Sequence, residues 1–167
     1  MTRHFLIAGA LLAASVSTTT VQAADIKIGA LYPITGGGAV YGVPAMLGNR
    51  MAVDEINAAG GINGQKVVIV ERDTKLNPAE AAAAAKELIT KDGVNLLIGG
   101  LSSGVGLAIS EVAKNEKVLY IATIPKTIQM TTSKLHPYVV RTASHTAFEG
   151  DAIAQIVKKL GAKKVCD

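Results

Sequence analysis

The sequence predicts an α/β protein, with a Rossmann-like parallel sheet and helices on both faces. Short apolar segments bounded by Gly, Asn, Asp or Pro alternate along the chain with segments of helical periodicity. The short segments are continuously apolar, which is typical of strands that helices cover on both sides. Alternating strands and helices join through right-handed crossovers, which produce a parallel sheet. The expected strands are residues 26–31, 67–70, 96–98, 118–122 and 138–140.

The first two expected helices have clear terminal signals. Residues 44–59 place Met46, Val53 and Ile56 on one stripe, and the helix stops at two consecutive glycines. Asn77 is placed to cap the second helix, with Pro78 in the first helical position. Glu80 stands in the third position, where its carboxylate could accept a hydrogen bond from the backbone N–H of Asn77. This helix is rich in alanine, which suits close packing on a sheet, and it ends before Gly93.

Two further helices follow the third and fifth strands. Residues 104–115 carry apolar side chains at helical spacing. Thr146 is the expected cap of the last helix, with Glu149 three residues later. Its apolar positions are Ile153, Ile156, Val157 and Leu160. A strand that begins near residue 164 stops almost at once, so we expect the sequence to be truncated.

The amino terminus predicts export. Residues 1–23 combine a short basic start, an apolar run too short to span a bilayer, and Val21-Gln22-Ala23 as a cleavage site. The cut is expected after Ala23 or one residue later, and the alternative is a signal anchor or a buried helix. The single cysteine, Cys166, lies far from the cut, so no lipid anchor is expected there. A free exported protein of this kind is expected in the periplasm.

Composition argues against several functions. The net charge is +4, but the basic residues are scattered, whereas a nucleic-acid reader would concentrate them with aromatics on one surface. His136 and His145 show neither metal-ligand spacing nor an evident Ser or Cys partner. We therefore expect no nucleic-acid partner, no metal, no cofactor and no catalytic activity.

Ligands of open parallel sheets bind outside the carboxyl ends of the strands, which directs attention to three loops. The loop after the third strand contains Ser102, Ser103 and Gly104 at the start of a helix. Free N–H groups and the helix dipole favour an anion there, and a ligand carboxylate would suit the position. The alternative is that a serine only caps its own helix.

The loop after the first strand is rich in glycine. Gly36, Gly38 and Gly42 make a loose relative of a dinucleotide-binding pattern, but no acid is well placed at the end of the second strand. Tyr41 could stack on or hydrogen-bond a ligand, or it could be a half-buried packing residue.

Several segments resemble the type I periplasmic binding proteins of the branched-chain amino acid ABC transporter family. They are residues 25–29 (DIKIG), 41–42 (YG), 54–64 (DEINAAGGING), 77–81 (NPAEA) and 98–103 (IGGLSS). The resemblance implies two lobes that close on a ligand and dock on a permease. It also implies that residues 24–141 form an incomplete first lobe and that residues 142–167 form the hinge crossing and the start of a truncated second lobe.

The resemblance further implies ligand contacts at Tyr41, Ser103, Ile124 and Lys126. Leucine-type binders have a small residue and a hydroxyl at the last two positions, whereas this chain has a bulky residue and a cation. Lys126 would repel an α-ammonium unless it points away, so an organic acid, an aromatic carboxylate or an amide is as plausible a ligand as an amino acid.

These observations predict the monomeric substrate-binding component of an ABC importer, with a small molecule and a membrane permease as partners. One rival is a ligand-sensing receptor domain of the same fold. The other is an exported enzyme that handles nucleotides or sugar phosphates.

Overall fold

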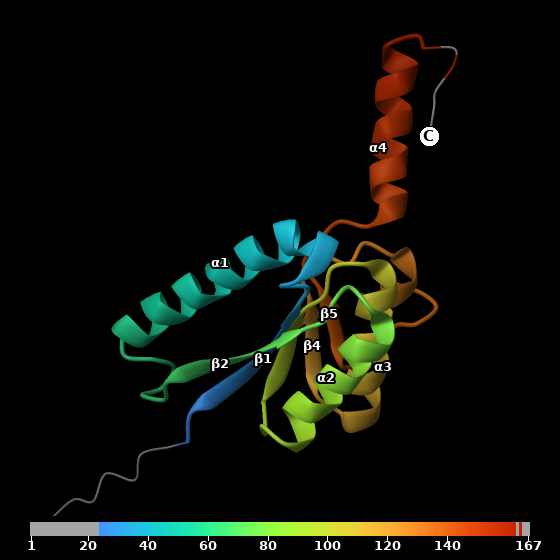
Figure 1. Ribbon diagram of the computed structural model, residues 1–167. Helices are drawn as coiled ribbons and strands as arrows, with labels where there is room; N and C mark the ends of the chain where they lie inside the picture. Colours follow the sequence, from blue (N-terminus) through green and yellow to red (C-terminus); the bar gives the residue numbers. More distant parts are fainter. Residues whose placement is uncertain (1–23, 163, 165–167) are drawn as a thin grey trace, which may run out of the picture.

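The computed structural model describes residues 24–162 and residue 164. Five parallel strands form one sheet in the order β2-β1-β3-β4-β5 (Figure 1), which confirms the predicted fold class. The strands are β1 (Ile26–Tyr32), β2 (Val67–Asp73), β3 (Leu96–Gly99), β4 (Leu119–Ala122) and β5 (Val139–Arg141). The helices are α1 (Ala39–Ala58), α2 (Pro78–Thr90), α3 (Ser103–Glu116) and α4 (Thr146–Lys159), with 3-10 turns η1 (Gly36–Gly38) and η2 (Ile128–Thr131).

The strand register brings all five carboxyl ends to one edge of the sheet. Tyr32 pairs with Asp73, and Gly99 pairs with Leu31 on one side and Ala122 on the other. The chain leaves β1 toward β2 on one side and continues from β2 to β3 on the other, so the order reverses between β1 and β3. Ligands of open α/β sheets bind at such a switch point, here called the carboxyl edge.

Helices cover the two faces of the sheet unequally. α2 and α3 cover one face, over a core that includes Leu31, Leu97 and Tyr120. On the other face α1 packs on β1 and β2, over Ala30 and Met46, and Ile98 of β3 packs against the same cluster. Further apolar side chains of that face lie on β4 and β5. Among them Leu119 is 37% and Val140 50% exposed.

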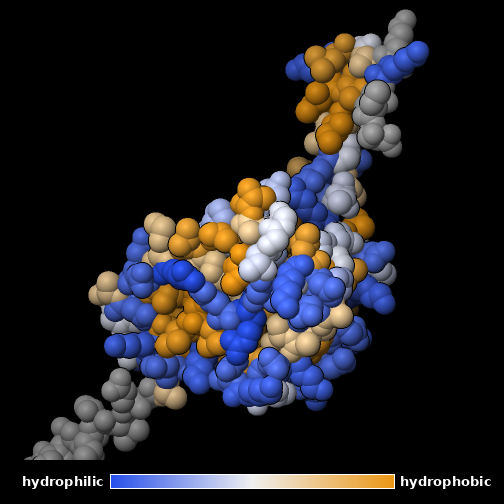
Figure 2. Space-filling view, viewed as in Figure 1, coloured by the Kyte–Doolittle hydropathy of each residue, from blue (hydrophilic) through white to orange (hydrophobic). Residues whose placement is uncertain are grey.

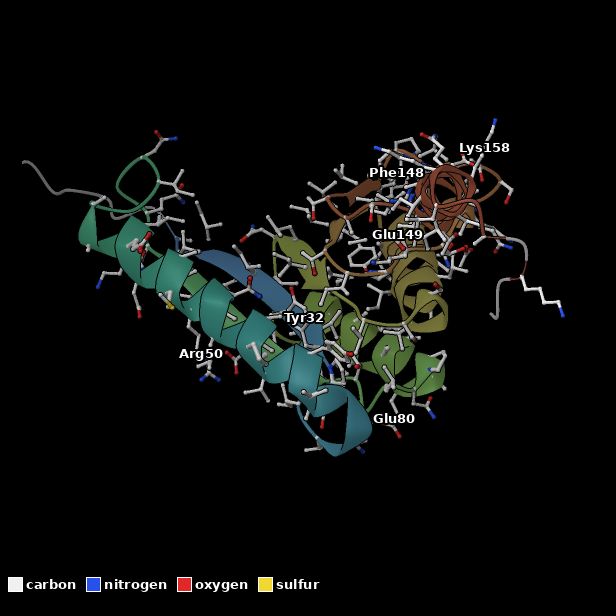
Figure 3. All side chains as sticks on the ribbon, turned by 90° about the horizontal axis from the view of Figure 1, so that it is seen from above. Tyr32, Arg50, Glu80, Phe148, Glu149 and Lys158 are labelled. Carbon is white, nitrogen blue, oxygen red and sulfur yellow. The ribbon has the colours of Figure 1, made fainter. Side chains whose placement is uncertain are left out.

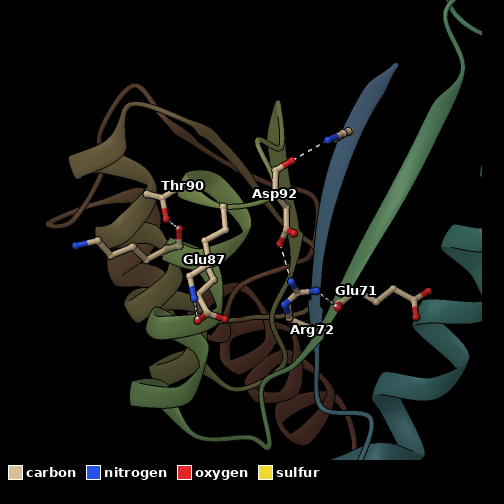
Figure 4. Close-up of polar contacts among 8 residues, drawn as sticks. Glu71, Arg72, Glu87, Thr90 and Asp92 are labelled. Atoms are coloured by element: carbon tan, nitrogen blue, oxygen red, sulfur yellow. Dashed lines mark hydrogen bonds and ion pairs between the residues drawn. The ribbon is translucent and has the colours of Figure 1, made fainter. Parts of the chain in front are cut away.

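Charged pairs tie β2 to its neighbours. Arg72 donates to the Asp92 carboxylate at 2.6 Å, which joins β2 to the segment after α2, and Lys27 donates to the Asp92 carbonyl (Figure 4). On the opposite face Arg50 of α1 forms a bidentate ion pair with Glu71, in which two guanidinium nitrogens each donate to one carboxylate oxygen. These pairs hold β2 at the edge of the sheet, where it has a single neighbouring strand.

Three local predictions need correction. α1 begins at Ala39, five residues before the predicted start, and Pro44 lies within the helix. The cap of α4 is His145, whose Nδ1 accepts from the Phe148 N–H at 3.1 Å, so Thr146 is the first helical residue. Asn77 caps α2 as predicted. The Glu80 carboxylate does not accept from the Asn77 N–H, as the capping pattern would require, and lies 3.6 Å from the Lys75 ammonium instead.

α4 stands away from the sheet and its covering helices, and Figure 2 shows apolar surface on it. No residue of α4 is buried, and Ile153, Ile156 and Leu160 are more than half exposed. The helices of the described part of the chain are each too short or too polar to cross a bilayer. The predicted signal peptide, residues 1–23, and Cys166 lie outside the described residues.

Candidate ligand-binding site at the carboxyl edge

Two glycines make the turn from β3 into α3. Gly99 and Gly100 have φ values of +122° and +82°, which L side chains rarely adopt. A Cβ on Gly99 would lie 2.3 Å from the Leu31 carbonyl oxygen, and one on Gly100 would lie 2.6 Å from the Tyr120 hydroxyl. The chain can therefore pass close to β1 and Tyr120 and present the start of α3 at the carboxyl edge only with glycine in both places.

Ser102 and Ser103 have different roles at the start of α3. The Ser102 hydroxyl accepts from the Val105 N–H at 3.3 Å, so Ser102 is the cap. Ser103 is the first helical residue and is half-buried, and Gly104 after it is exposed. The N–H groups of a first helical turn have no partner within the helix. Ser103 and Gly104 thus offer two N–H groups and one hydroxyl to an anion.

Two buried tyrosines form hydrogen bonds to residues at this edge, and neither was predicted from the sequence as part of the site. Tyr32, at the end of β1, shares a hydrogen bond of 2.9 Å with the Thr123 hydroxyl in the loop after β4 (Figure 3 labels Tyr32). Tyr120 donates to the Gly99 carbonyl at 2.9 Å. Burial raises the pKa of Tyr120, so its hydroxyl stays protonated and remains a donor.

Asp73 anchors the glycine-rich loop after β1. Its carboxylate accepts from the backbone N–H groups of Ile34 at 3.0 Å and Lys75 at 2.8 Å, and from the Thr35 hydroxyl at 2.5 Å. Burial opposes its ionisation, but the hydrogen bonds from Thr35, Lys75 and Ile34 outweigh that effect and lower its pKa.

Asp73 thus stands at the end of the second strand, where the sequence suggested that no acid is well placed for a nucleotide. In dinucleotide-binding folds this position binds a ribose. Here both oxygens of Asp73 hold the chain's own loop, and that occupation weighs against a nucleotide at the edge.

Tyr41 lies in the first turn of α1, at the carboxyl edge, and is 64% exposed. Of the two interpretations that the sequence allowed, the half-buried packing residue is wrong. Ile124, in the loop after β4, packs against the core cluster of Ala30, Tyr32 and Met46. Its apolar side chain thus extends the hydrophobic core toward the carboxyl edge.

Lys126 points toward α4. Its Nζ lies 2.5 Å from Glu149 Oε1, and the Ser144 hydroxyl donates to the same oxygen at 2.6 Å (Figure 3 labels Glu149). The hydrogen bond from Lys126 is the largest influence on Glu149 and lowers its pKa. The sequence left open whether Lys126 faces the ligand or solvent, and in this structure its ammonium is paired with Glu149.

His136 is buried and has a serine partner, which the sequence did not reveal. Its Nδ1 accepts from the Tyr138 N–H at 3.2 Å, so the neutral ring carries its proton on Nε2 and donates to the Ser110 hydroxyl at 2.9 Å. A histidine with that tautomer cannot take the proton of Ser110. The pair is therefore a buried structural link between α3 and the segment before β5, and it supplies no nucleophile.

A groove of about 560 Å³ lies beside this pair, away from the predicted site. It runs between α3 and the segment before β5 and is lined by Leu107, Ala108, Ser110, Glu111, Lys114, Ser133, Lys134 and Leu135. None of the predicted ligand residues takes part in it. Within the described residues, no cluster of three His, Cys, Asp or Glu side chains is placed to hold a metal ion.

The fold and this edge define a class, a Rossmann-like domain with loops placed to bind a ligand at a topological switch point. A family model for periplasmic binding proteins matches residues 25–166. The chain belongs to this family.

Curated relatives are named for branched-chain amino acids. The chain is 41% identical over 117 residues to the Leu/Ile/Val-binding protein homolog 8 of Brucella abortus, covering 69% of this chain and 29% of that protein. It is 34% identical over 150 residues to the Leu/Ile/Val-binding protein BraC3 of Rhizobium johnstonii, covering 90% of this chain and 40% of that protein. The chain thus spans well under half the length of these relatives.

Solved structures extend the comparison to two ligand classes. The substrate-binding protein LivJ of Streptococcus pneumoniae, in complex with isoleucine, matches 80% of this chain and 38% of its own, with 33% identity and a TM-score of 0.75. A solute-binding protein from R. palustris, in complex with 4-hydroxybenzoate, matches 85% of this chain and 38% of its own, with 30% identity and a TM-score of 0.73.

Proposed function

We propose that this chain contains the ligand-capturing first lobe of the substrate-binding component of an ABC importer, and that its ligand is a small carboxylate. The single observation that carries the proposal is the start of α3. There Ser102 serves as the cap and leaves the N–H groups and hydroxyl of Ser103 and Gly104 facing the carboxyl edge. Family membership supports the transport role.

The ligand proposal depends on chemistry that two solved relatives share. One holds isoleucine and the other 4-hydroxybenzoate, and both molecules carry a carboxylate. The helix start, with its positive dipole end and free N–H groups, suits that common group. Tyr41 and Ile124 would then contact the remainder of the molecule, and Lys126 would act through its pairing with Glu149.

The lobe boundary and the route of export are part of the same proposal. Residues 24–141 form the first lobe, and residues 142–167 cross to a second lobe. Support comes from α4, which follows β5 directly and buries none of its side chains. The signal peptide over residues 1–23 would direct the complete protein, as a monomer, to the periplasm, where it delivers its ligand to a permease.

An NMR titration of the purified, amide-labelled chain tests the site. L-leucine and 4-hydroxybenzoate, each at millimolar concentration, are expected to shift the amide signals of Ser103 and Gly104 most strongly. Ser103→Ala is expected to weaken binding of the carboxylate by about 1.5–3 kcal/mol, the range for a hydrogen bond to a charged group.

Glucose serves as the uncharged control and is expected to leave these amide signals in place. A carboxylate that shifts the amides around the α3 groove and leaves Ser103 and Gly104 unchanged would place the site elsewhere and overturn the proposal.

A further inference from the structure

A compact polar cluster joins the loop after β4 to the first turn of α4. Besides the Lys126–Glu149 contact, the Thr146 N–H donates to the Lys126 carbonyl at 2.9 Å. Ser144 donates to the same carboxylate oxygen as Lys126 does. Glu149 therefore receives two donors, and both chemical ends of Lys126, its carbonyl and its ammonium, contact residues that follow β5.

Glu149 compensates the only charged position among the predicted ligand residues. The Lys126 and Glu149 side chains are 47% and 34% exposed, so the pair lies at the surface of the carboxyl edge. The guanidinium of the nearby Arg141 donates to two neutral oxygens, the Thr127 carbonyl and the Thr131 hydroxyl, each at 2.6 Å, so it is held in place but keeps its charge. The net charge at this part of the edge thus becomes one unit more positive when Glu149 is lost.

From this geometry we infer that Glu149 is a specificity-determining residue, which lets the carboxyl edge accept a carboxylate that carries a neighbouring ammonium. This inference rests on the proposed function. Without Glu149, the Lys126 ammonium would lose its carboxylate partner and add an unpaired positive charge to the carboxyl edge, the edge at which α3 begins. That charge would attract a simple anion and repel the ammonium of an amino acid.

A purely structural role for the pair leads to a different expectation. If Glu149 only fastens α4 to the sheet, its loss should change the affinity for all ligands to a similar extent. A role in charge compensation should instead change the ratio between two ligands that differ only in the ammonium. L-leucine and 4-methylpentanoate are such a pair, because they share the carboxylate and the branched side chain.

The experiment measures the dissociation constants of both ligands by NMR for the purified chain and three variants. Glu149→Gln is expected to raise the preference for 4-methylpentanoate over L-leucine by roughly two- to fivefold, the effect of one exposed charge pair. Lys126→Met leaves Glu149 unpaired and is expected to shift the preference toward L-leucine. The double variant is expected to return close to the original ratio.

Glu55→Gln is the matched control, since it removes the same charge from the far end of α1, away from the carboxyl edge. It is expected to leave the ratio unchanged. The inference is overturned if Glu149→Gln and Lys126→Met alter the two affinities equally, or both shift the ratio in one direction, while Ser103 and Gly104 still report binding. If neither ligand shifts those two amides in any form of the chain, the proposed function itself fails, and the inference fails with it.

Discussion

Single carboxylates illustrate how residues far apart in the sequence set the geometry of the carboxyl edge. Asp73 is separated by 39 residues from Ile34, whose N–H it accepts, and Glu149 by 23 residues from Lys126. Each carboxylate accepts hydrogen bonds that would otherwise be made to water, and each thereby fixes a loop that faces the candidate ligand. Their ionisation should therefore be linked to stability.

Asp73→Asn tests this linkage. The pKa of Asp73 is lowered in the folded chain, so its stabilising effect is present above the unfolded value of about 3.9 and is lost as the pH falls through the folded value. At pH 7 the variant is expected to lose about 1 kcal/mol of unfolding free energy. Below about pH 4 the gap between variant and parent should narrow, as measured by urea denaturation across pH.

Asp54→Asn is the control, because Asp54 is exposed on α1. It should change stability little at either pH. If the difference in unfolding free energy between Asp73→Asn and the parent stays constant from pH 7 to pH 3, the carboxylate does not act through its charge.

At the scale of elements, two amphipathic helices of the same length have different surroundings. α3 buries its apolar stripe against the sheet and α2, and Ile109 is fully buried in it. α4 presents a comparable stripe, but Ile156 is 57% exposed. Helical periodicity alone predicted both stripes correctly, and it could not show which of them has a partner in this chain.

Paired alanine substitutions distinguish the two helices. Ile109→Ala is expected to cost about 2–5 kcal/mol of unfolding free energy, since it leaves a cavity in the core. Ile156→Ala should stay within about 0.5 kcal/mol of the parent, as exposed positions do. Chemical denaturation followed by circular dichroism measures both. A large loss for Ile156→Ala would mean that α4 packs on the body of the molecule in solution.

The whole molecule leaves apolar surface on one side of its sheet. α1 covers β1 and β2, whereas Leu119 and Val140 on β4 and β5 remain exposed on the same face. Parallel sheets are normally covered on both faces. The curated relatives are more than twice as long as this chain.

The chain alone is therefore expected to self-associate as its concentration rises. Val140→Thr combined with Leu119→Thr should shift the association to higher concentration, because both substitutions remove apolar surface and keep strand-forming residues. Sedimentation velocity over a dilution series measures the effect. If the parent and the double variant associate equally, the exposed face of β4 and β5 is not the surface that associates. The apolar surface of α4 is then the next candidate, and the double substitution Ile153→Gln and Ile156→Gln tests it.

The sequence by itself determined the elements and several of their ends, although it placed the start of α1 five residues late and the cap of α4 on Thr146. Signals such as the Asn77 cap, the Ser102 cap and the paired glycines after α1 act within about one helical turn, so they can be read from neighbouring residues. The sequence also predicted the carboxyl edge, because parallel strands place their ends together. Part of the candidate site, the start of α3, followed from these two signals.

Only the tertiary structure decided how distant side chains are used. The pairing of His136 with Ser110, the anchoring of the first loop by Asp73 and the pairing of Lys126 with Glu149 each join residues more than 20 positions apart. Such contacts depend on strand register and on the direction of each side chain, which no periodicity encodes. The charge presented to a ligand at this edge is therefore a property of the folded chain, since it results from a pair whose members meet only after the sheet has formed.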